Sequence, residues 1–382
     1  MTRPLRVLAA VQLRPIESGQ VVMNRLITSL PFNGVELRVL DASLCDEMSQ
    51  MRGLSLRKLV RLAGLPWRVL WARLRGADAL YYTPSGPTRA GCIKDALVLL
   101  PARIVYRATI LHVHASGIGE FLHGRSGLWA WAARRALGRC TLLVRLSPST
   151  PADQVTLEAR SDACIANALP DESALLSINR SAPPDDAPLR LLFVGLHIPA
   201  KGLTTILDAV ERLRATGQRC ELETLGSFNN PTYRSEVANR LLGTHLAGAV
   251  TLSGSRFGAD KLAVFARADV LVFPSTFDSE TLPLVVMEAM AAGLPVIATR
   301  WRGIPDLVED GVTGILLQPA SGPSLATAVA VAIDTLAADP QLRQRMGQAG
   351  RDRFRAGFSV AAFQAAWQAQ FQRLAASLHG AT

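Results

Sequence analysis

The sequence has few lysines, no paired cysteine motif and no long apolar run. Lysine supplies only 4 of its 41 basic residues. The five cysteines include no Cys-x-x-Cys pair, which excludes the common zinc motifs and indicates small, buried thiols in a reducing compartment. They are Cys45, Cys92, Cys140, Cys164 and Cys220. No stretch reaches the roughly 18 apolar residues of a membrane-spanning helix. Arg14 and Pro15 stand where a signal peptide would need its cleavage site, so we expect a cytoplasmic protein.

Basic residues are concentrated in the first half of the chain. Residues 1–180 hold 23 Lys and Arg against 13 Asp and Glu, whereas residues 181–382 hold 18 of each. Such an excess favours an anionic partner, either a membrane surface, a phosphate-bearing acceptor or nucleic acid. Compositional bias is the alternative, because Arg outnumbers Lys 37 to 4. The chain has no helix-turn-helix, zinc or RNP-like motif, so we expect no nucleic-acid partner.

The order of apolar segments indicates an α/β protein with two doubly wound, Rossmann-like domains. A length of 382 residues favours two domains, and short apolar runs alternate with helical segments as in parallel sheets. A linker rich in Pro and Asp at 181–188 separates residues 1–180 from residues 189–359. Residues 360–382 are an amphipathic helix that could pack back on the N-terminal domain. In the first domain we expect strands at residues 5–11, 35–40, 79–82, 104–106, 109–113 and 142–146.

Two glutamates dominate the chemistry of the second domain. A strand ends near Pro274, a polar loop carries Glu280, and an apolar helix over 284–292 contains Glu288. A glutamate in an apolar helix needs a hydrogen-bond donor. The first helix amides, those of Leu284 and Val285, form a ready phosphate site. The glutamates are therefore placed to hold sugar hydroxyls beside a phosphate. The alternatives are a structural glutamate at 288 and a solvated loop charge at 280.

This segment resembles the E-x7-E motif of glycosyltransferase family 4 and its GT-B relatives. The similarity includes the Glu-Ala-Met-Ala-x-Gly-x-Pro-Val continuation and the later Gly-Val-Thr-Gly-Ile-Leu, and it covers most of residues 189–360. It implies a GT-B fold, with two Rossmann-like domains facing a central cleft, an acceptor-binding N-terminal domain and a nucleotide-sugar-binding C-terminal domain. The implied activity is retaining transfer of a hexose-type sugar to a glycan or lipid-linked acceptor, as in bacterial cell-surface polysaccharide synthesis.

The resemblance also implies roles for individual residues. Glu280 would contact the transferred sugar, Glu288 the ribose, and Lys201 the diphosphate. Gly195 and Gly254 stand in segments that resemble the phosphate-binding loop and the strand end near the nucleotide.

The sequence departs from the family at the residue after Gly195. The family usually has a basic residue there, but this chain has Leu196, so Lys201 acts alone or a base such as Arg256 or Arg300 replaces the missing one. The departure keeps a second interpretation open, in which the chain is a catalytically weak or inactive GT-B scaffold that acts as a binding module. Pro283 lacks an amide and removes one further phosphate contact.

No Asp-x-Asp sequence occurs, so the metal-chelating diphosphate site of the other major glycosyltransferase fold is missing. We expect the leaving-group charge to fall on Lys201 and the helix start. The expectation is therefore an enzyme with no metal and no cofactor other than its nucleotide-sugar co-substrate.

The N-terminal half offers fewer candidates. His114 follows a predicted strand, where α/β proteins keep catalytic groups, and by resemblance it meets the donor sugar. We expect His112 on the opposite face of that strand. Gly19 stands where the family often has a Gly-Gly pair near the donor.

Residues 54–76 contain no acidic residue and combine arginines with leucines and tryptophans. This composition is typical of an interfacial amphipathic helix, broken or kinked at Pro66, on the inner face of the cytoplasmic membrane. An ordinary crossover helix that covers the sheet is the alternative. The arginines with helical spacing are Arg57, Arg61, Arg68 and Arg75, and the apolar face is Leu56, Leu59, Val60, Ala63, Trp67, Leu70, Trp71 and Leu74.

Overall fold

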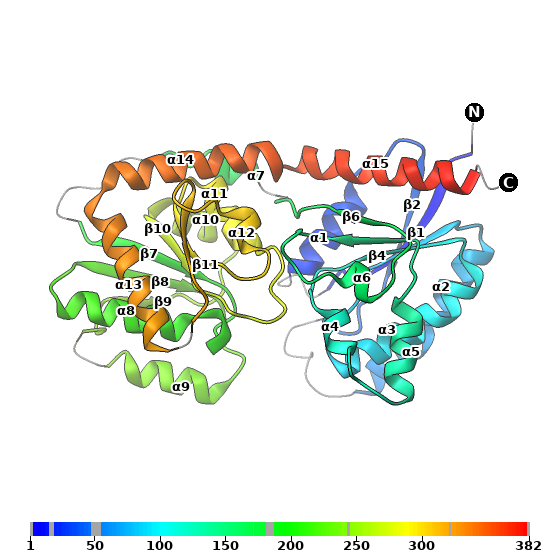
Figure 1. The fold of residues 1–382 in the computed structure, drawn as a ribbon, viewed down its shortest axis with the longest axis horizontal. Coiled ribbons are helices and arrows are strands. Elements are labelled where there is room, and N and C mark those ends of the chain that lie inside the picture. Colours follow the sequence, from blue (N-terminus) through cyan, green and yellow to red (C-terminus); the bar gives the residue numbers. More distant parts are fainter. Residues whose placement is uncertain are drawn as a thin grey trace. The chain divides into compact units, whose positions relative to one another are not determined.

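The computed structural model describes residues 3–14, 19–46, 55–170, 172–180, 187–242, 245–320 and 322–379. The chain divides into two compact units, Met1–Pro170 with Val360–Thr382 and Asp171–Ser359. Each unit holds one six-stranded parallel sheet with helices between its strands (Figure 1). The doubly wound α/β architecture expected from the sequence is confirmed.

The first unit has the strand order β2-β1-β3-β4-β5-β6. Its central strands β3 and β4 are buried along their whole length, as expected for parallel strands covered on both faces. The strands are β1 (Leu5–Val11), β2 (Val35–Asp41), β3 (Ala79–Tyr82), β4 (Ala108–His112), β5 (Leu142–Arg145) and β6 (Asp162–Cys164). The helices are α1 (Gly19–Ser29), α2 (Leu56–Leu74), α3 (Arg89–Val105), α4 (Ile118–Leu122), α5 (Leu128–Leu137), α6 (Asp153–Thr156) and α15 (Val360–His379).

The second unit has the strand order β12-β11-β10-β7-β8-β9. Its first strand β7 pairs with its fourth strand β10, which is the Rossmann order with its topological switch point between these two strands. The strands are β7 (Leu189–Val194), β8 (Cys220–Leu225), β9 (Val250–Leu252), β10 (Val270–Phe273), β11 (Val296–Thr299) and β12 (Gly314–Leu317). The helices are α7 (Glu172–Leu176), η2 (Pro199–Lys201), α8 (Leu203–Ala215), α9 (Pro231–Arg240), α10 (Gly258–Arg267), α11 (Leu284–Ala291), α12 (Ile304–Leu307), α13 (Pro323–Ala338) and α14 (Pro340–Gly357).

The C-terminal helix α15 belongs to the first unit. Its Trp367 is fully buried, with its ring centroid 5.3 Å from that of Tyr81 on β3. Phe371 meets Phe32 at 5.0 Å between ring centroids. Helix α15 therefore completes a core whose other side chains come from the start of the chain.

The structural boundary precedes Asp171, whereas the sequence placed the linker at 181–188. Arg180 explains the difference, because its guanidinium donates to the carbonyl oxygens of Phe265, Ala268 and Ala292 at 2.5–2.6 Å. These carbonyls lie at the C-terminal ends of α10 and α11, where a cation is favourable. Residues 172–180 are thereby fixed to the second unit. Residues 181–186 of the expected linker lie outside the described residues.

Two further expectations are wrong. Residues 104–106 are not a strand, because α3 continues through Pro101 to Val105 and the Tyr106 amide donates to the Ala102 carbonyl oxygen at 2.9 Å. Their β-branched and aromatic composition suggested a strand, but tertiary context overrides such propensities. Cys164 is exposed rather than buried. Among the described helices, none alone is long and apolar enough to cross a membrane, and only the bent pair Pro323–Ala338 and Pro340–His379 reaches that length and composition when joined.

Candidate active site

Lys201 and Glu280 form an ion pair at the switch point of the second unit. Lys201 ends the turn that follows β7, and Glu280 lies in the loop that follows β10, its neighbour in the sheet. The Lys201 Nζ atom lies 2.6 Å from Glu280 Oε2, and the Ser275 hydroxyl donates to the same oxygen at 2.8 Å. The two side chains are only 16% and 8% exposed. Glu280 is therefore a buried, paired carboxylate and not a solvated loop charge.

The two loops are held together by their backbones. The Thr276 amide donates to the Ala200 carbonyl oxygen at 2.8 Å. Gly202 has φ +90°, and a Cβ there would lie 2.7 Å from the Pro274 carbonyl oxygen, so only glycine allows this approach. The Lys201 ammonium also lies 4.9 Å from the centroid of the Phe277 ring, a cation–π distance.

Glu288 is paired with a lysine that the sequence did not single out. Glu288 lies in α11, and Lys261 of α10 approaches its Oε1 atom to 2.6 Å. The donor that a glutamate in an apolar helix needs is thus the ammonium group of Lys261. Leu284 and Val285 carry the first amides of α11, as expected. Lys261 had one available signal, because it is one of only four lysines in the chain.

The sequence and the fold are similar to those of known glycosyltransferases. A family model for glycosyl transferases group 1 matches residues 188–335, which include both ion pairs. Alpha-D-kanosaminyltransferase of Streptomyces kanamyceticus is 30% identical over 164 residues, 43% of this chain and 40% of that protein. A putative colanic acid biosynthesis glycosyltransferase, WcaL of Salmonella typhimurium, is 30% identical over 156 residues, 40% of this chain and 38% of that protein. The chain thus matches less than half of the length of each of these relatives.

The fold of the whole chain is also similar to solved structures. Anabaena HepE, crystallised with UDP, superposes with a TM-score of 0.69 at 19% identity and covers 98% of this chain and 100% of its own. At that identity the likeness concerns the fold. The chain carries a group 1 glycosyl transferase domain in a GT-B fold.

The departure at Leu196 is not compensated by its neighbour. In the glycosyl transferase domain His197 is buried between Phe193 and Phe228, with ring centroids at 5.7 and 4.6 Å. Burial lowers the pKa of His197 to about 4, so its imidazole is neutral near pH 7.

The other residues predicted to lie near the donor are two glycines and two arginines. Gly195 and Gly254 both lie against Gly226. The Gly226 amide donates to the Gly254 carbonyl oxygen at 3.0 Å. A Cβ atom on Gly226 would collide with the Gly195 carbonyl oxygen. Arg300 is bound to Asp310 at 2.8 Å, and Arg256 is exposed. Lys201, with its side chain 16% exposed, is therefore less exposed than Arg256 and Arg300.

His114 lies in the first unit, two residues beyond the end of β4. Its ring centroid is 4.1 Å from that of His112, whose Nδ1 atom lies 2.6 Å from the Tyr81 hydroxyl. The expectation that the two histidines occupy opposite faces is wrong, because residues i and i+2 of an extended chain point to the same side. Burial lowers the pKa of His114 to about 3, so this side chain is neutral near pH 7.

A buried carboxylate orders the loop after His114. Asp153 accepts hydrogen bonds from the amides of Gly117 at 3.0 Å and Gly119 at 2.7 Å. No local pattern predicts this contact, because the partners lie 34 and 36 positions apart in the chain. Gly19 is the first residue of α1, and residues 15–18 of the same loop lie outside the described residues. Within the described parts, no three His, Cys, Asp or Glu side chains gather where they could hold a metal ion.

Proposed function

We propose that the protein is a retaining glycosyltransferase that moves a hexose-type sugar from a nucleotide diphosphate sugar to a glycan or lipid-linked acceptor. The Lys201–Glu280 pair at the switch point of the second unit carries the proposal. Open α/β sheets bind their ligands beyond the carboxyl ends of the strands at such points. An ammonium group has three N–H donors, so Lys201 can hold Glu280 and a phosphate oxygen together.

The proposed roles follow from this placement. Lys201 and the first amides of α11 stabilise the leaving diphosphate, a preorganised electrostatic site that acts without metal or cofactor. Glu280 orients a hydroxyl of the transferred sugar, and Glu288 binds the ribose. His114, as a neutral imidazole, hydrogen-bonds the donor sugar and does not act as a general base.

We propose a cytoplasmic location, with binding to the inner face of the cytoplasmic membrane and a role in cell-surface polysaccharide synthesis. Helix α2 supports this, because it packs through Leu65 and Val69 and exposes most of its predicted apolar face, including Trp67 at 73% and Trp71 at 57%. The helix is continuous across Pro66. Helix α3 contacts both α2 and α5 (Figure 1). Helices α3 and α5 also carry exposed apolar side chains, which include Ile104 of α3 and Leu128 and Trp131 of α5. Exposed tryptophans beside leucines suit the headgroup level of a bilayer.

A donor screen tests the activity. We expect one of the UDP-, GDP- and ADP-sugars at 100 times its dissociation constant to stabilise the protein by about 2.7 kcal/mol. Release of the nucleoside diphosphate should continue in EDTA. Loss of turnover in EDTA that manganese restores would contradict the metal-independent mechanism. A donor that binds but is never turned over would favour the binding module that Leu196 keeps open.

Vesicle sedimentation tests the membrane proposal. The wild type should sediment with anionic vesicles, and the double variant Trp67→Ser/Trp71→Ser should remain in the supernatant. Leu242→Ser, which removes an exposed apolar side chain of the second unit, is the control. A wild type that stays in the supernatant at low salt leaves α2 as a crossover helix only.

A further inference from the structure

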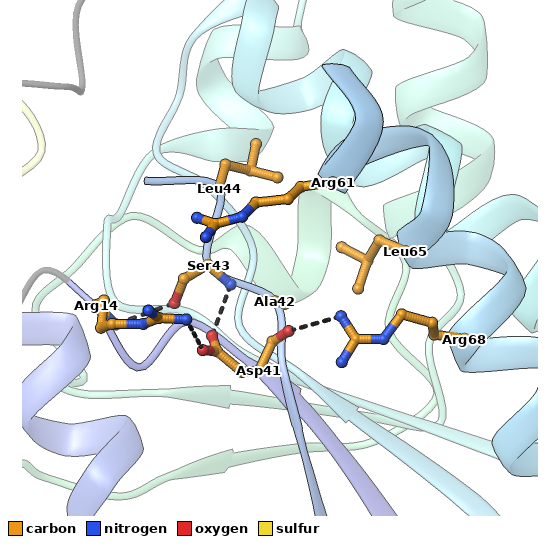
Figure 2. A pocket seen from close by; sticks show the side chains of 8 residues that line it. All are labelled: Arg14, Asp41, Ala42, Ser43, Leu44, Arg61, Leu65 and Arg68. Atoms are coloured by element: carbon orange, nitrogen blue, oxygen red, sulfur yellow. Dashed lines mark hydrogen bonds and ion pairs between the residues drawn. The ribbon is translucent and has the colours of Figure 1, made fainter. Parts of the chain in front are cut away.

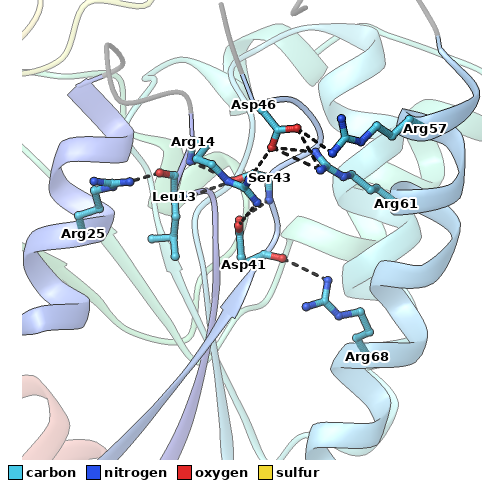
Figure 3. A network of polar contacts seen from close by, with 9 residues as sticks. All are labelled: Leu13, Arg14, Arg25, Asp41, Ser43, Asp46, Arg57, Arg61 and Arg68. Carbon is cyan, nitrogen blue, oxygen red and sulfur yellow. Dashed lines mark hydrogen bonds and ion pairs between the residues drawn. The ribbon is translucent and has the colours of Figure 1, made fainter.

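Three arginines of α2, Arg57, Arg61 and Arg68, meet a pair of aspartates that their spacing in the sequence did not reveal. Arg57 and Arg61 bind the Asp46 carboxylate at 3.2 and 3.1 Å (Figure 3). Arg14, which follows β1, binds Asp46 at 2.5 Å and Asp41, the last residue of β2, at 2.7 Å. The cluster therefore lies at the carboxyl ends of β1 and β2, the edge at which α/β sheets bind ligands.

A cavity of about 130 Å³ lies within this cluster (Figure 2). Its charged lining groups are three arginines, Arg14, Arg61 and Arg68, and one carboxylate, Asp41. Since a water molecule takes up about 30 Å³ of liquid, the cavity has room for several waters or for a group of phosphate size. The remaining lining residues are Ala42, Ser43, Leu44 and Leu65.

The arginines are held in place before any ligand arrives. Asp41 and Asp46 fix Arg14 and Arg61, while the Ser43 hydroxyl accepts from the Arg14 amide at 3.0 Å. Arg68 donates to the Asp41 carbonyl oxygen at 3.3 Å, a bond that takes one of the five N–H donors of a guanidinium. Positive charge on the lining exceeds negative charge, and planar guanidinium groups suit phosphate oxygens.

We propose that this cavity binds a phosphate or diphosphate group carried by the acceptor. The proposal rests on the proposed function, and it assigns the acceptor an anionic end. It also assigns Arg61 and Arg68 of α2 to the acceptor, while the exposed Trp67 and Trp71 of the same helix remain the lipid-facing groups.

Calorimetric titration with inorganic pyrophosphate tests the cavity. The Lys201→Gln variant is the background, so that the phosphate site of the second unit is weakened. Saturable binding is expected, and Arg61→Gln and Arg68→Gln should each weaken it about tenfold or more, because each removes charge-assisted hydrogen bonds. Lys58→Gln removes one charge from the same helix outside the cavity lining and should leave the affinity unchanged. Absence of saturable binding, or equal affinity in all variants, would overturn the proposal.

Two further ligands identify the source of the phosphate. Farnesyl diphosphate that binds more tightly than pyrophosphate, with the gain lost in Trp67→Ser/Trp71→Ser, supports a lipid-linked acceptor. A sugar phosphate that competes with pyrophosphate while the prenyl chain adds nothing supports a soluble phosphorylated glycan. Pyrophosphate binding by a protein that never turns over a nucleotide sugar would contradict the proposed function and support the cavity as a phosphate site. Turnover on a phosphate-bearing acceptor that Arg61→Gln and Arg68→Gln leave unchanged would support the proposed function and contradict the role of the cavity.

Discussion

The two units place charge differently on the same kind of sheet. In the second unit, each motif glutamate is matched by one lysine at 2.6 Å, Glu280 by Lys201 and Glu288 by Lys261. In the first unit, four arginines surround two aspartates, so the cluster keeps a positive excess. Balanced pairs suit a site that orients hydroxyls and shares one cation with a diphosphate. An unbalanced cluster suits the capture of an anion.

Removing the buried carboxylate of the second unit should have the largest effect. Glu280→Ala should lower kcat by about 10²–10³-fold with little change in donor KM, because it removes an interaction with the reacting sugar. Steady-state kinetics of nucleotide release measures this. Glu236→Ala, which changes an exposed glutamate of α9, is the control. Wild-type turnover in Glu280→Ala would remove this residue from the catalytic site.

Acidification should separate the stabilities of the two units. His114 and His197 have pKa values lowered to about 3 and about 4, and burial lowers that of His112 as well. As the pH falls, these histidines bind protons in the unfolded chain before they do so in the folded protein. The stability that they contribute is therefore present above pH 6.5 and is lost as the pH drops below it. Between pH 7 and pH 5 each such histidine should cost about 2 kcal/mol.

The first unit holds two of these histidines and the second holds one, so the first should lose more stability. Hydrogen exchange at pH 7 and pH 5, corrected for intrinsic rates, reports each unit separately. Equal losses in the two units would show that His112 and His114 do not titrate as a buried pair.

Glu288→Ala should weaken donor binding about tenfold and leave kcat nearly unchanged, because a ribose contact is made equally in ground and transition states. Lys261→Met sharpens the comparison, since it removes the partner of Glu288 without removing the carboxylate. It should therefore bind donor better than Glu288→Ala does. Equal affinity in both variants, measured by calorimetry, would give Glu288 a purely structural role.

Local pattern was sufficient for much of the fold and insufficient for the site. Residues 5–11 and 79–82 were predicted with their observed limits, because each is a mainly apolar run bounded by proline or polar residues. Lys201 and Glu280 are 79 positions apart, and only the family resemblance brought them together in advance. The helical spacing of the arginines in residues 54–76 predicted that they lie on one side of a helix. It could not predict that Asp41 and Asp46 bind three of them. Those aspartates come from another segment, and their position depends on strand pairing.

Hydrogen exchange with bound donor tests most directly whether the nucleotide diphosphate binds at the switch point of the second unit and not in the cationic cavity of the first. The ligand is the nucleotide sugar that gives the largest thermal shift. We expect protection in residues 195–202 and 275–288, which carry Lys201, Glu280 and Glu288, and no protection in residues 41–46 or in α2. Protection confined to residues 41–46 and α2 would contradict the account, because the cationic cavity of the first unit would then be the donor site.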